Sequence, residues 1–438
     1  MKTLRFAVTL ALLGGVSAFA TNARVESMGK SSMFIMDDIS IFDNPANINL
    51  YPNFLIGELG NYLYHQDSVK LGQNRDPLEP WFGGIFSLDI GGGNSLSIAG
   101  ALNRKEERLF KYFPDKIYAG ALKFNPKDIG TQGTVAPDPV TNFDGFLGGN
   151  FNNKAFGAHI YIAHQDGMYD NGTISTAAFV SAVQGDIGTN IEINKDNSFE
   201  AAFGMARIQY GPRDRSFGDA DLFSYFASAR FFTGIDAIRG HLIPAANFRN
   251  MSAPGREEFE VRGGCGVDAA FDRGFFWMGL NLFYNKQKAD SNWVQNTDGA
   301  SIYRDIKGNK KGLAGDVTQL WQFGGTISFG IERNIWWDWF VIRVGGQKTI
   351  AYADYNTGTR NQNSVLCPDK NGCPKDGNYF VTNEVNDGTR NDNVGFGFGI
   401  NIEEKLKIDM TVAEDVMFRN PFQGEGRLIS RVSATYSF

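Results

Sequence analysis

The feature that most limits the fold of this chain is an alternation of apolar and polar residues that recurs over strand-length windows. In "EEKLKIDMTVAEDV" two sets of positions interleave: Leu406, Ile408, Met410 and Val412 are apolar, and Lys405, Lys407, Asp409 and Thr411 are polar. Successive side chains on a β-strand point to opposite faces, so this stretch has one apolar and one polar face. The pattern returns at 153–164, 273–286, 392–403 and 427–438. Its recurrence indicates an all-β chain.

Similar windows cover much of the remaining chain, near 54–64, 80–90, 94–103, 115–124, 143–151, 173–190, 198–210, 221–233, 256–271, 318–332 and 337–352. We therefore expect roughly 14–16 antiparallel strands, each of about the 9–11 residues that a tilted membrane strand requires. Tight turns are expected at 152, 195, 272, 333 and 403, and long polar loops near 65–79, 289–317, 353–376 and 417–427. The regular alternation of short and long connections between strands is not seen between residues 190 and 256, which indicates that a strand there is missed or split.

Two environments fit such strands: a soluble sandwich with its apolar faces inside, or a barrel with those faces against lipid. The polar faces here are rich in Gly, Ser, Ala and Asn, which suits a crowded lumen. Trp336, Trp337 and Trp339 in "NIWWDWF" are interpreted as an aromatic girdle at the membrane–water boundary, with a buried tryptophan cluster as the alternative. We interpret the fold as a transmembrane antiparallel β-barrel, occupying residues 54–438, with long extracellular loops.

The two ends of the sequence agree with export. Residues 1–20 have a basic start, an apolar stretch and a final Ala-Phe-Ala, which is the layout of a signal peptide. A membrane-anchoring helix is the alternative, but the apolar stretch is shorter than the ~20 residues that span a bilayer. The chain ends at Phe438, with Tyr436 on the same strand face, and this resembles the C-terminal signal that the assembly machinery of bacterial outer-membrane barrels recognises.

Composition and motifs exclude several functions. The net charge of −6 and the lack of a basic cluster argue against nucleic acid as a partner. The four histidines, His65, His159, His164 and His241, have no metal-binding spacing, and we find no nucleophile elbow or phosphate-binding loop. His159 and His164 are interpreted as packing in the lumen or at its rim. The sequence therefore predicts no catalytic residues, no metal, no cofactor and no enzymatic activity.

Adjacent carboxylates and cysteines have simpler interpretations. Glu106–Glu107 and Glu257–Glu258 would point to opposite strand faces, so we interpret them as solvated charge. Cys367 and Cys373 lie close together in "CPDKNGCP", where an exported chain would form a disulfide. Free thiols or half of a metal site are the alternatives. Cys265 has no mate and is interpreted as a small packing residue.

Residues 21–53 precede the first strand and are too polar to cross a bilayer alone. Asn44 is a good N-cap and Pro45 suits a first helical position, so a short helix should begin at Pro45. The segment resembles the N-terminus of FadL-like outer-membrane proteins, including relatives associated with type IX secretion. The matching residues are Arg24, Met28-Gly29, Asp37-Asp38 and Asn44-Pro45-Ala46, whereas Lys30 and Asp43 depart from the family pattern.

The resemblance implies a barrel of about 14 strands with residues 21–53 folded into the lumen as a hatch. Its implied function is passive uptake of small, hydrophobic compounds through the outer membrane of a Gram-negative bacterium. Expected partners are outer-membrane lipid, the barrel assembly machinery and a small hydrophobic ligand. A barrel that anchors or docks partner proteins through its extracellular loops is the alternative function, and a soluble exported β-protein is a third.

Overall fold

The computed structural model describes residues 22–29, 33–59, 80–110, 116–117, 134–135, 141–170, 175–212, 220–253, 256–289, 318–357, 376–381, 393–403, 405–412 and 429–438. Short helices precede the strands: α2 (Asn22–Ser27) and two 3-10 helices, η1 (Asp38–Phe42) and η2 (Pro45–Leu50). The main strands before residue 200 are β1 (Phe54–Leu59), β2 (Trp81–Gly91), β3 (Asn94–Leu102), β6 (Thr141–Phe151), β7 (Lys154–Asp170), β8 (Ser175–Asn194) and β9 (Asn197–Pro212). Those after it are β10 (Ala220–Ile235), β11 (Gly240–Ala253), β12 (Arg256–Phe271), β13 (Gly274–Ala289), β14 (Thr318–Asn334), β15 (Phe340–Thr357), β16 (Asp376–Val381), β17 (Asn393–Ile402), β18 (Leu406–Val412) and β19 (Ile429–Ser437).

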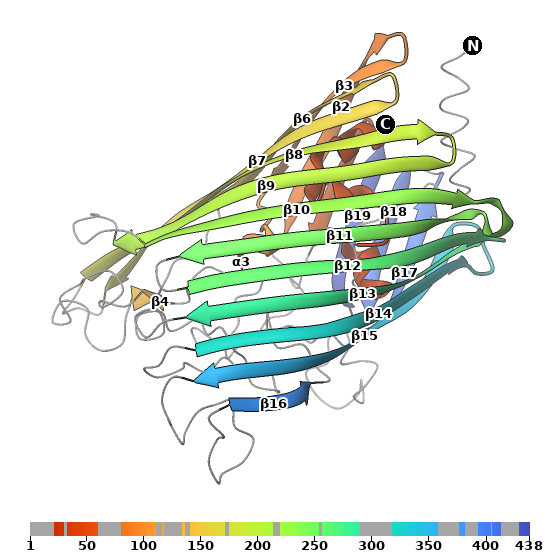
Figure 1. Ribbon diagram of the computed structural model, residues 1–438. Helices are drawn as coiled ribbons and strands as arrows, with labels where there is room; N and C mark the ends of the chain where they lie inside the picture. The colour runs from red at the N-terminus through yellow and green to blue at the C-terminus, as the bar shows by residue number, and fades with distance from the viewer. Residues whose placement is uncertain are drawn as a thin grey trace.

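These strands form one closed antiparallel barrel (Figure 1). The main sheet has 17 strands, and β1 pairs with both β2 and β19, which closes the ring. Strand β16 pairs with the far end of β15, beyond the stretch that β17 covers, so 16 strands make up the circuit. Sixteen is the upper end of the range expected from sequence. The count of about 14 implied by the family resemblance is wrong.

One helical turn, one 3-10 helix and one small two-stranded sheet lie in the connections between strands of this circuit. A single helical turn, α3 (Glu107–Phe110), follows β3, and η4 (Asp236–Ile238) joins β10 to β11. Strands β4 (Lys116–Ile117) and β5 (Thr134–Val135) pair with each other in a separate two-stranded sheet. All three interrupt or extend connections between neighbouring barrel strands, so the order of strands around the ring still follows the order of the sequence.

The missing strand between residues 190 and 256 is β11. Pro244 lies in its middle and lacks the N–H that a ladder needs, and neither Ile243 nor Pro244 has a register partner on β10. With β11 included, the turns after β6, β8, β10, β12, β14 and β17 fall at one rim, together with Asn53 and Phe438, whose backbones are hydrogen-bonded. The two-residue connection from β11 to β12 lies at the opposite rim. Asn152 and Asn153 adopt φ of 50° and 66°, the left-handed conformation that a two-residue hairpin turn requires.

Two other expectations need correction. The turn placed at residue 333 lies instead between the end of β14 at Asn334 and the start of β15 at Phe340. Strands β7 to β15 have 14 to 20 residues, not 9–11, so the ladders run well beyond a bilayer-spanning length.

The alternation places polar residues inside the ring and apolar residues outside. On β18, Lys407, Asp409 and Thr411 are 6%, 1% and 3% exposed, whereas Leu406, Ile408 and Met410 are only partly covered. Strand after strand contributes large exposed apolar side chains to the outer surface, among them Phe82, Ile98, Leu147, Ile187, Met205, Leu280, Leu282 and Ile327. The described residues include no helix long and apolar enough to cross a membrane.

Candidate functional site: the lumen and the segment inside it

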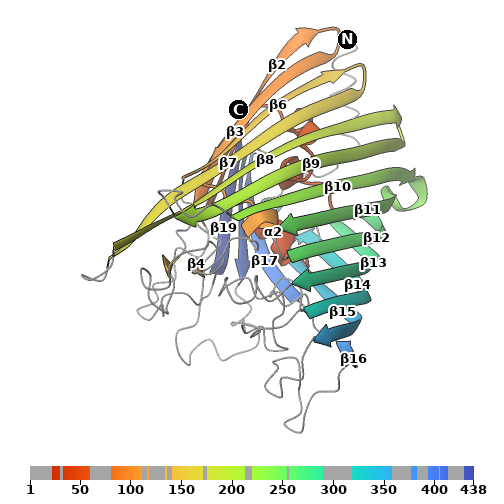
Figure 2. The same ribbon diagram turned by 60° about the vertical axis from the view of Figure 1, so that its left-hand side comes forward.

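The lumen of the barrel contains the chain's own N-terminal residues. We call 22–29 and 33–51 the plug segment; its red ribbon lies within the ring of strands in both views (Figures 1 and 2). Each 3-10 helix begins at a side chain suited to capping. Asp37 accepts a hydrogen bond from Ile39 N–H at 3.1 Å, and Asn44 accepts one from Ala46 N–H at 3.1 Å, with Pro45 in the first helical position. The short helix expected at Pro45 is therefore confirmed as η2.

Glycines of the barrel wall line the surface on which this segment packs. A Cβ on Gly157 or Gly188 would clash with the Asn44–Ala46 turn, and one on Gly330 or Gly345 would clash with Met28. Other wall glycines lie equally close to the plug segment: Gly148 to Ile48, Gly266 and Gly279 to Phe34, and Gly395 and Gly397 to Ser27. The absence of side chains at these glycines thus lets the plug segment approach the wall closely.

A buried ion cluster holds the first part of the plug segment. Arg24, 1% exposed, donates from Nε and Nη2 to the two carboxylate oxygens of Glu332 at 2.7 and 2.6 Å. Glu332 also accepts from Arg343 Nε at 2.9 Å, and Arg343 Nη1 lies 2.7 Å from Asp409. The charges alternate in sign from Arg24 of α2 to Glu332 of β14, Arg343 of β15 and Asp409 of β18. Each buried charge therefore has an opposite charge beside it, which offsets the free-energy cost of its burial.

Apolar packing holds the second part. Phe42 is edge-to-face with Trp81 at 5.7 Å and with Phe146 at 5.6 Å between ring centroids. The surrounding cluster joins plug residues to the first barrel strands: Ile41, Ile48, Tyr51, Phe54, Ile56, Ile85, Ala99 and Ala101. Hydrophobic burial therefore anchors residues 41–51, and a second apolar cluster of Met28, Phe34, Ile35 and Trp277 adds to the ion pairs of the first part.

The Asp37–Asp38 pair lies between these two parts. Asp37 and Asp38 are 2% and 0% exposed. Burial raises the pKa of Asp37 to about 8, and the nearby charge of Arg24 offsets only part of this. Burial, followed by the charges of Asp37 and Asp409, raises the pKa of Asp38 well above its ordinary value. Six residues named from sequence, Arg24, Asp37, Asp38, Asn44, Pro45 and Ala46, therefore all lie inside the barrel.

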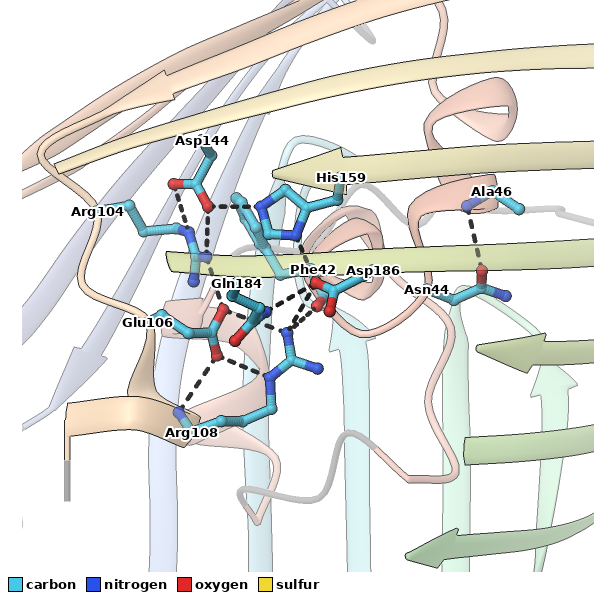
Figure 3. A network of polar contacts seen from close by, with 10 residues as sticks. All are labelled: Phe42, Asn44, Ala46, Arg104, Glu106, Arg108, Asp144, His159, Gln184 and Asp186. Atoms are coloured by element: carbon cyan, nitrogen blue, oxygen red, sulfur yellow. Dashed lines mark hydrogen bonds and ion pairs between the residues drawn. The ribbon is translucent and has the colours of Figure 1, made fainter. Parts of the chain in front are cut away.

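A second polar network, missed from sequence, clamps the plug segment from the side of β6, β7 and β8 (Figure 3). Arg104 donates from Nε and Nη2 to the two carboxylate oxygens of Asp144 at 3.0 and 2.7 Å. Its Nη2 also donates to Glu106 at 2.8 Å, and its guanidinium stacks 3.8 Å from the ring centroid of Phe42. Arg108 donates to the carbonyl of Phe42 at 2.7 Å. Arg104 and Arg108, which follow β3, therefore contact η1 directly.

The wall side of this network is centred on a histidine. His159, 4% exposed, has its two ring nitrogens 2.5 Å from Asp186 and 2.9 Å from Asp144 (Figure 3). Gln184 donates to Asp186 at 2.7 Å, and Arg108 lies 3.7 Å from the same carboxylate. The lumenal packing expected for His159 is confirmed, whereas His164 is exposed.

The interpretation of the adjacent glutamates as solvated charge is wrong for two of them. Glu106 and Glu258 are each 3% exposed. Burial alone would raise the pKa of Glu106, but Arg108 and Arg104 outweigh it and hold this pKa below its usual range. Glu258 lies 3.3 Å from Arg249 on the neighbouring strand. For Glu106 the local signal was the presence of both basic and acidic residues in "RKEER", because buried charges need close partners of opposite sign.

The other residues named from sequence lie away from the lumen. Trp336, Trp337 and Trp339 are 75%, 53% and 46% exposed on the turn between β14 and β15, with Trp337 and Trp339 stacked at 5.1 Å. A buried tryptophan cluster is therefore excluded for these three residues, while the girdle stays a prediction. Tyr436 and Phe438 are 43% and 60% exposed at the rim where the chain ends. Cys265 is a free, exposed cysteine.

Some predictions fall outside the described residues. These are the signal peptide, the Cys367–Cys373 disulfide and most of the long loops at 289–317 and 353–376. Within the described part of the chain, no three His, Cys, Asp or Glu side chains are grouped so as to hold a metal ion. What the site offers is therefore a polar lumen that the chain's own segment fills, with no evident reaction centre among those residues.

No family model matches the chain, and no curated protein matches it. Solved structures that resemble it include CdiB from Escherichia coli, at 9% identity and a TM-score of 0.41, over 89% of this chain and 63% of CdiB. A Pseudomonas aeruginosa FadL homologue has 14% identity and a TM-score of 0.35, over 95% and 98% of the two chains. The P. putida toluene transporter TodX has 10% identity and a TM-score of 0.36, over 96% and 99%. Because these identities and TM-scores are low, we base no inference on the likenesses.

Proposed function

We propose that this protein is a channel of the Gram-negative outer membrane, closed by its plug segment, for passive uptake of small compounds. The observation that supports the proposal most is the content of the lumen. A closed barrel with an apolar outer surface encloses polar side chains and a separate piece of chain, not a continuous apolar core. Such an inside-out distribution suits lipid outside and a water-accessible route inside.

The plug segment has the properties of a gate. It is joined to the wall by ion pairs, capped turns and glycine contacts, and no strand of the main sheet includes it. Its displacement would therefore leave the barrel ladder intact. The hydrophobic character of the cargo is what the resemblance of residues 24–46 to FadL-like proteins implies.

The test displaces the plug segment without removing it. In Gly157→Val the Cβ alone already clashes with the backbone of Pro45 and Ala46, whereas at Gly185 on the next strand an added Cβ has nothing within 4 Å. Overpacking costs about 1–3 kcal/mol, which would shift the ratio of seated to released plug by roughly 5- to 150-fold. We expect G157V, but not G185V, to raise solute permeability in liposomes.

Deletion of Arg24–Leu50 provides the upper limit of that permeability. A shift in gel mobility on boiling should first establish that each variant has a folded barrel. If the deletion, G157V and wild type all fold and are equally impermeable, the protein is not a channel closed by this segment, and a docking role through the loops would be favoured.

A further inference from the structure

Asp38 is a buried carboxyl whose oxygens have no donor. Its side chain is fully buried, and neither Oδ1 nor Oδ2 has a hydrogen-bond partner among the described residues. Asp37 is adjacent, and only its Oδ1 is used, as the cap of η1. A buried ionised carboxylate without donors is strongly unfavourable, because it loses its hydration and gains nothing in exchange.

The charged groups around the pair do not supply what Asp38 lacks. Arg24 directs two nitrogens to Glu332, and Arg230 donates to Glu200 and to the carbonyl of Ile35. The groups that face the pair from neighbouring elements are Arg24 of α2, Asp43 and Tyr51 beside η2, Arg230 of β10, and Lys407 and Asp409 of β18. Glu200 of β9 is the ion-pair partner of Arg230. Acidic and basic groups are both present, and the guanidinium groups of Arg24 and Arg230 donate to acceptors other than Asp38.

We propose that Asp38, with its neighbour Asp37, is a proton-binding site that keeps the plug segment seated in acid and favours its release as the pH rises. This rests on the proposed function, because it assigns the regulation of the same gate. In the seated state the carboxyl is protonated and needs no countercharge. In the released state water solvates it, and it ionises as an ordinary aspartate does.

The direction of the pH effect on seating follows from proton linkage. Burial raises the pKa of both carboxyls in the seated state above the value of about 3.9 expected when they are solvated. The seated state therefore binds more protons, so seating is strongest below the solvated pKa and weakens as pH rises toward the seated pKa. For one proton, the seated-to-released ratio falls by up to about tenfold per pH unit in that window.

The experiment measures solute permeability of liposomes containing the full-length protein from pH 5 to pH 8. For wild type we expect permeability to rise with pH by up to about tenfold per unit. Asp38→Asn keeps the shape but cannot ionise, so we expect its permeability to rise less steeply with pH than that of wild type, with Asp37 accounting for the rise that is left. The matched control Asp338→Asn changes a carboxylate on an exposed turn, where Arg273 lies 2.9 Å away, and should behave like wild type.

A second readout follows the plug segment directly. Ser27 is fully buried against Gly397, so a cysteine there reacts with a maleimide only after release. We would place Ser27→Cys in a chain whose three native cysteines are replaced by serine, with and without Asp38→Asn. The ratio of the two labelling rates cancels the pH dependence of the thiol itself, and we expect this ratio to rise with pH.

Two results would overturn the inference: wild-type permeability that does not change with pH, or D38N that keeps the full wild-type slope. Either can occur while deletion of Arg24–Leu50 still opens the pore, in which case the channel proposal survives and only the proton site is rejected. If the deletion itself leaves the barrel impermeable, the proposed function fails first.

Discussion

At the scale of single residues, the lumen tolerates charge where buried ions of opposite sign lie close together. Arg24 illustrates this, since its guanidinium matches both oxygens of Glu332 from a segment more than 300 residues away in the chain. Such a pair lends specificity more than stability, because burial of both ions is itself unfavourable. The arrangement ties α2, which packs mainly against β17 and β18, to β14 as well.

Arg24→Ala should destabilise the seated plug by about 3–5 kcal/mol, because it leaves a buried carboxylate short of one partner. The change can be measured as the urea concentration at which a maleimide first labels a cysteine at position 27. Arg207→Ala is the matched control, because Arg207 pairs with Asp221 at 2.9 Å on an exposed surface, where such pairs contribute about 0–1 kcal/mol. Equal effects of the two substitutions would contradict the anchoring role of Arg24.

At the scale of elements, the residues from Asn103 to Phe110 form a clamp whose integrity depends on Glu106. Glu106 receives Arg104 and Arg108 at 2.8 Å each, and these two arginines contact Phe42 of the plug. Folding lowers the pKa of Glu106, so the ionised side chain stabilises the fold at every pH above its unfolded pKa of about 4.3. This stabilisation is lost only as the pH falls from there toward the folded pKa. Its contribution is therefore constant across the window assigned to Asp38.

Glu106→Gln should loosen this clamp and expose Arg104 and Lys105, which are 7% and 5% exposed in the native protein. We expect trypsin to cut the folded variant between residues 104 and 108 while wild type resists there, as read by mass spectrometry of the fragments. Glu403→Gln, at an exposed turn, is the control and should leave this site uncut. Protection of E106Q equal to that of wild type would show that the clamp does not depend on Glu106.

The elements that sequence reasoning found are those whose pattern is local. Strict alternation identified β13, β17, β18 and β19, and Asn44-Pro45 identified the start of η2. Strand β11 was missed because Pro244 interrupts its alternating pattern. The clamp was missed because "RKEER" has the composition of a solvated charged stretch. Which charges are buried depends on what packs over them, and the partners of Arg104 and Arg24 lie 40 and 308 residues away. Such pairings are set by the closed ring and leave no local trace.

At the scale of the whole molecule, the outer surface is the distinguishing property. Leu280 and Leu282 on β13 are each 52% exposed, and comparable side chains surround the barrel. A surface of this kind is unfavourable in water and favourable in a bilayer. The number of strands, in contrast, could not be deduced from sequence to better than two, because one missed strand changes the count without changing the pattern of the others.

Leu280→Arg discriminates between these environments. In the centre of a bilayer the charge should destabilise the folded barrel by about 2–4 kcal/mol, falling to about 0–1 kcal/mol near the interface. Phe271→Arg, beside the turn between β12 and β13, is the interfacial control. The measurement is the urea midpoint for folding into lipid vesicles. In a water-soluble barrel, L280R would be neutral, and that outcome would argue against membrane insertion.

The proposed membrane barrel requires that the alternating residues of each strand face lipid on one side and the lumen on the other. The most direct test is a nitroxide scan of β13 in vesicles, reading collisions with oxygen, which partitions into lipid, and with a water-soluble nickel complex. We expect labels at Met278, Leu280 and Leu282 to collide mainly with oxygen, and labels at Trp277, Asn281 and Phe283, which are buried in the lumen, to show low oxygen access. If both sets report the same environment, or the first set is as accessible to nickel as to oxygen, the apolar surface does not face lipid and the account is wrong.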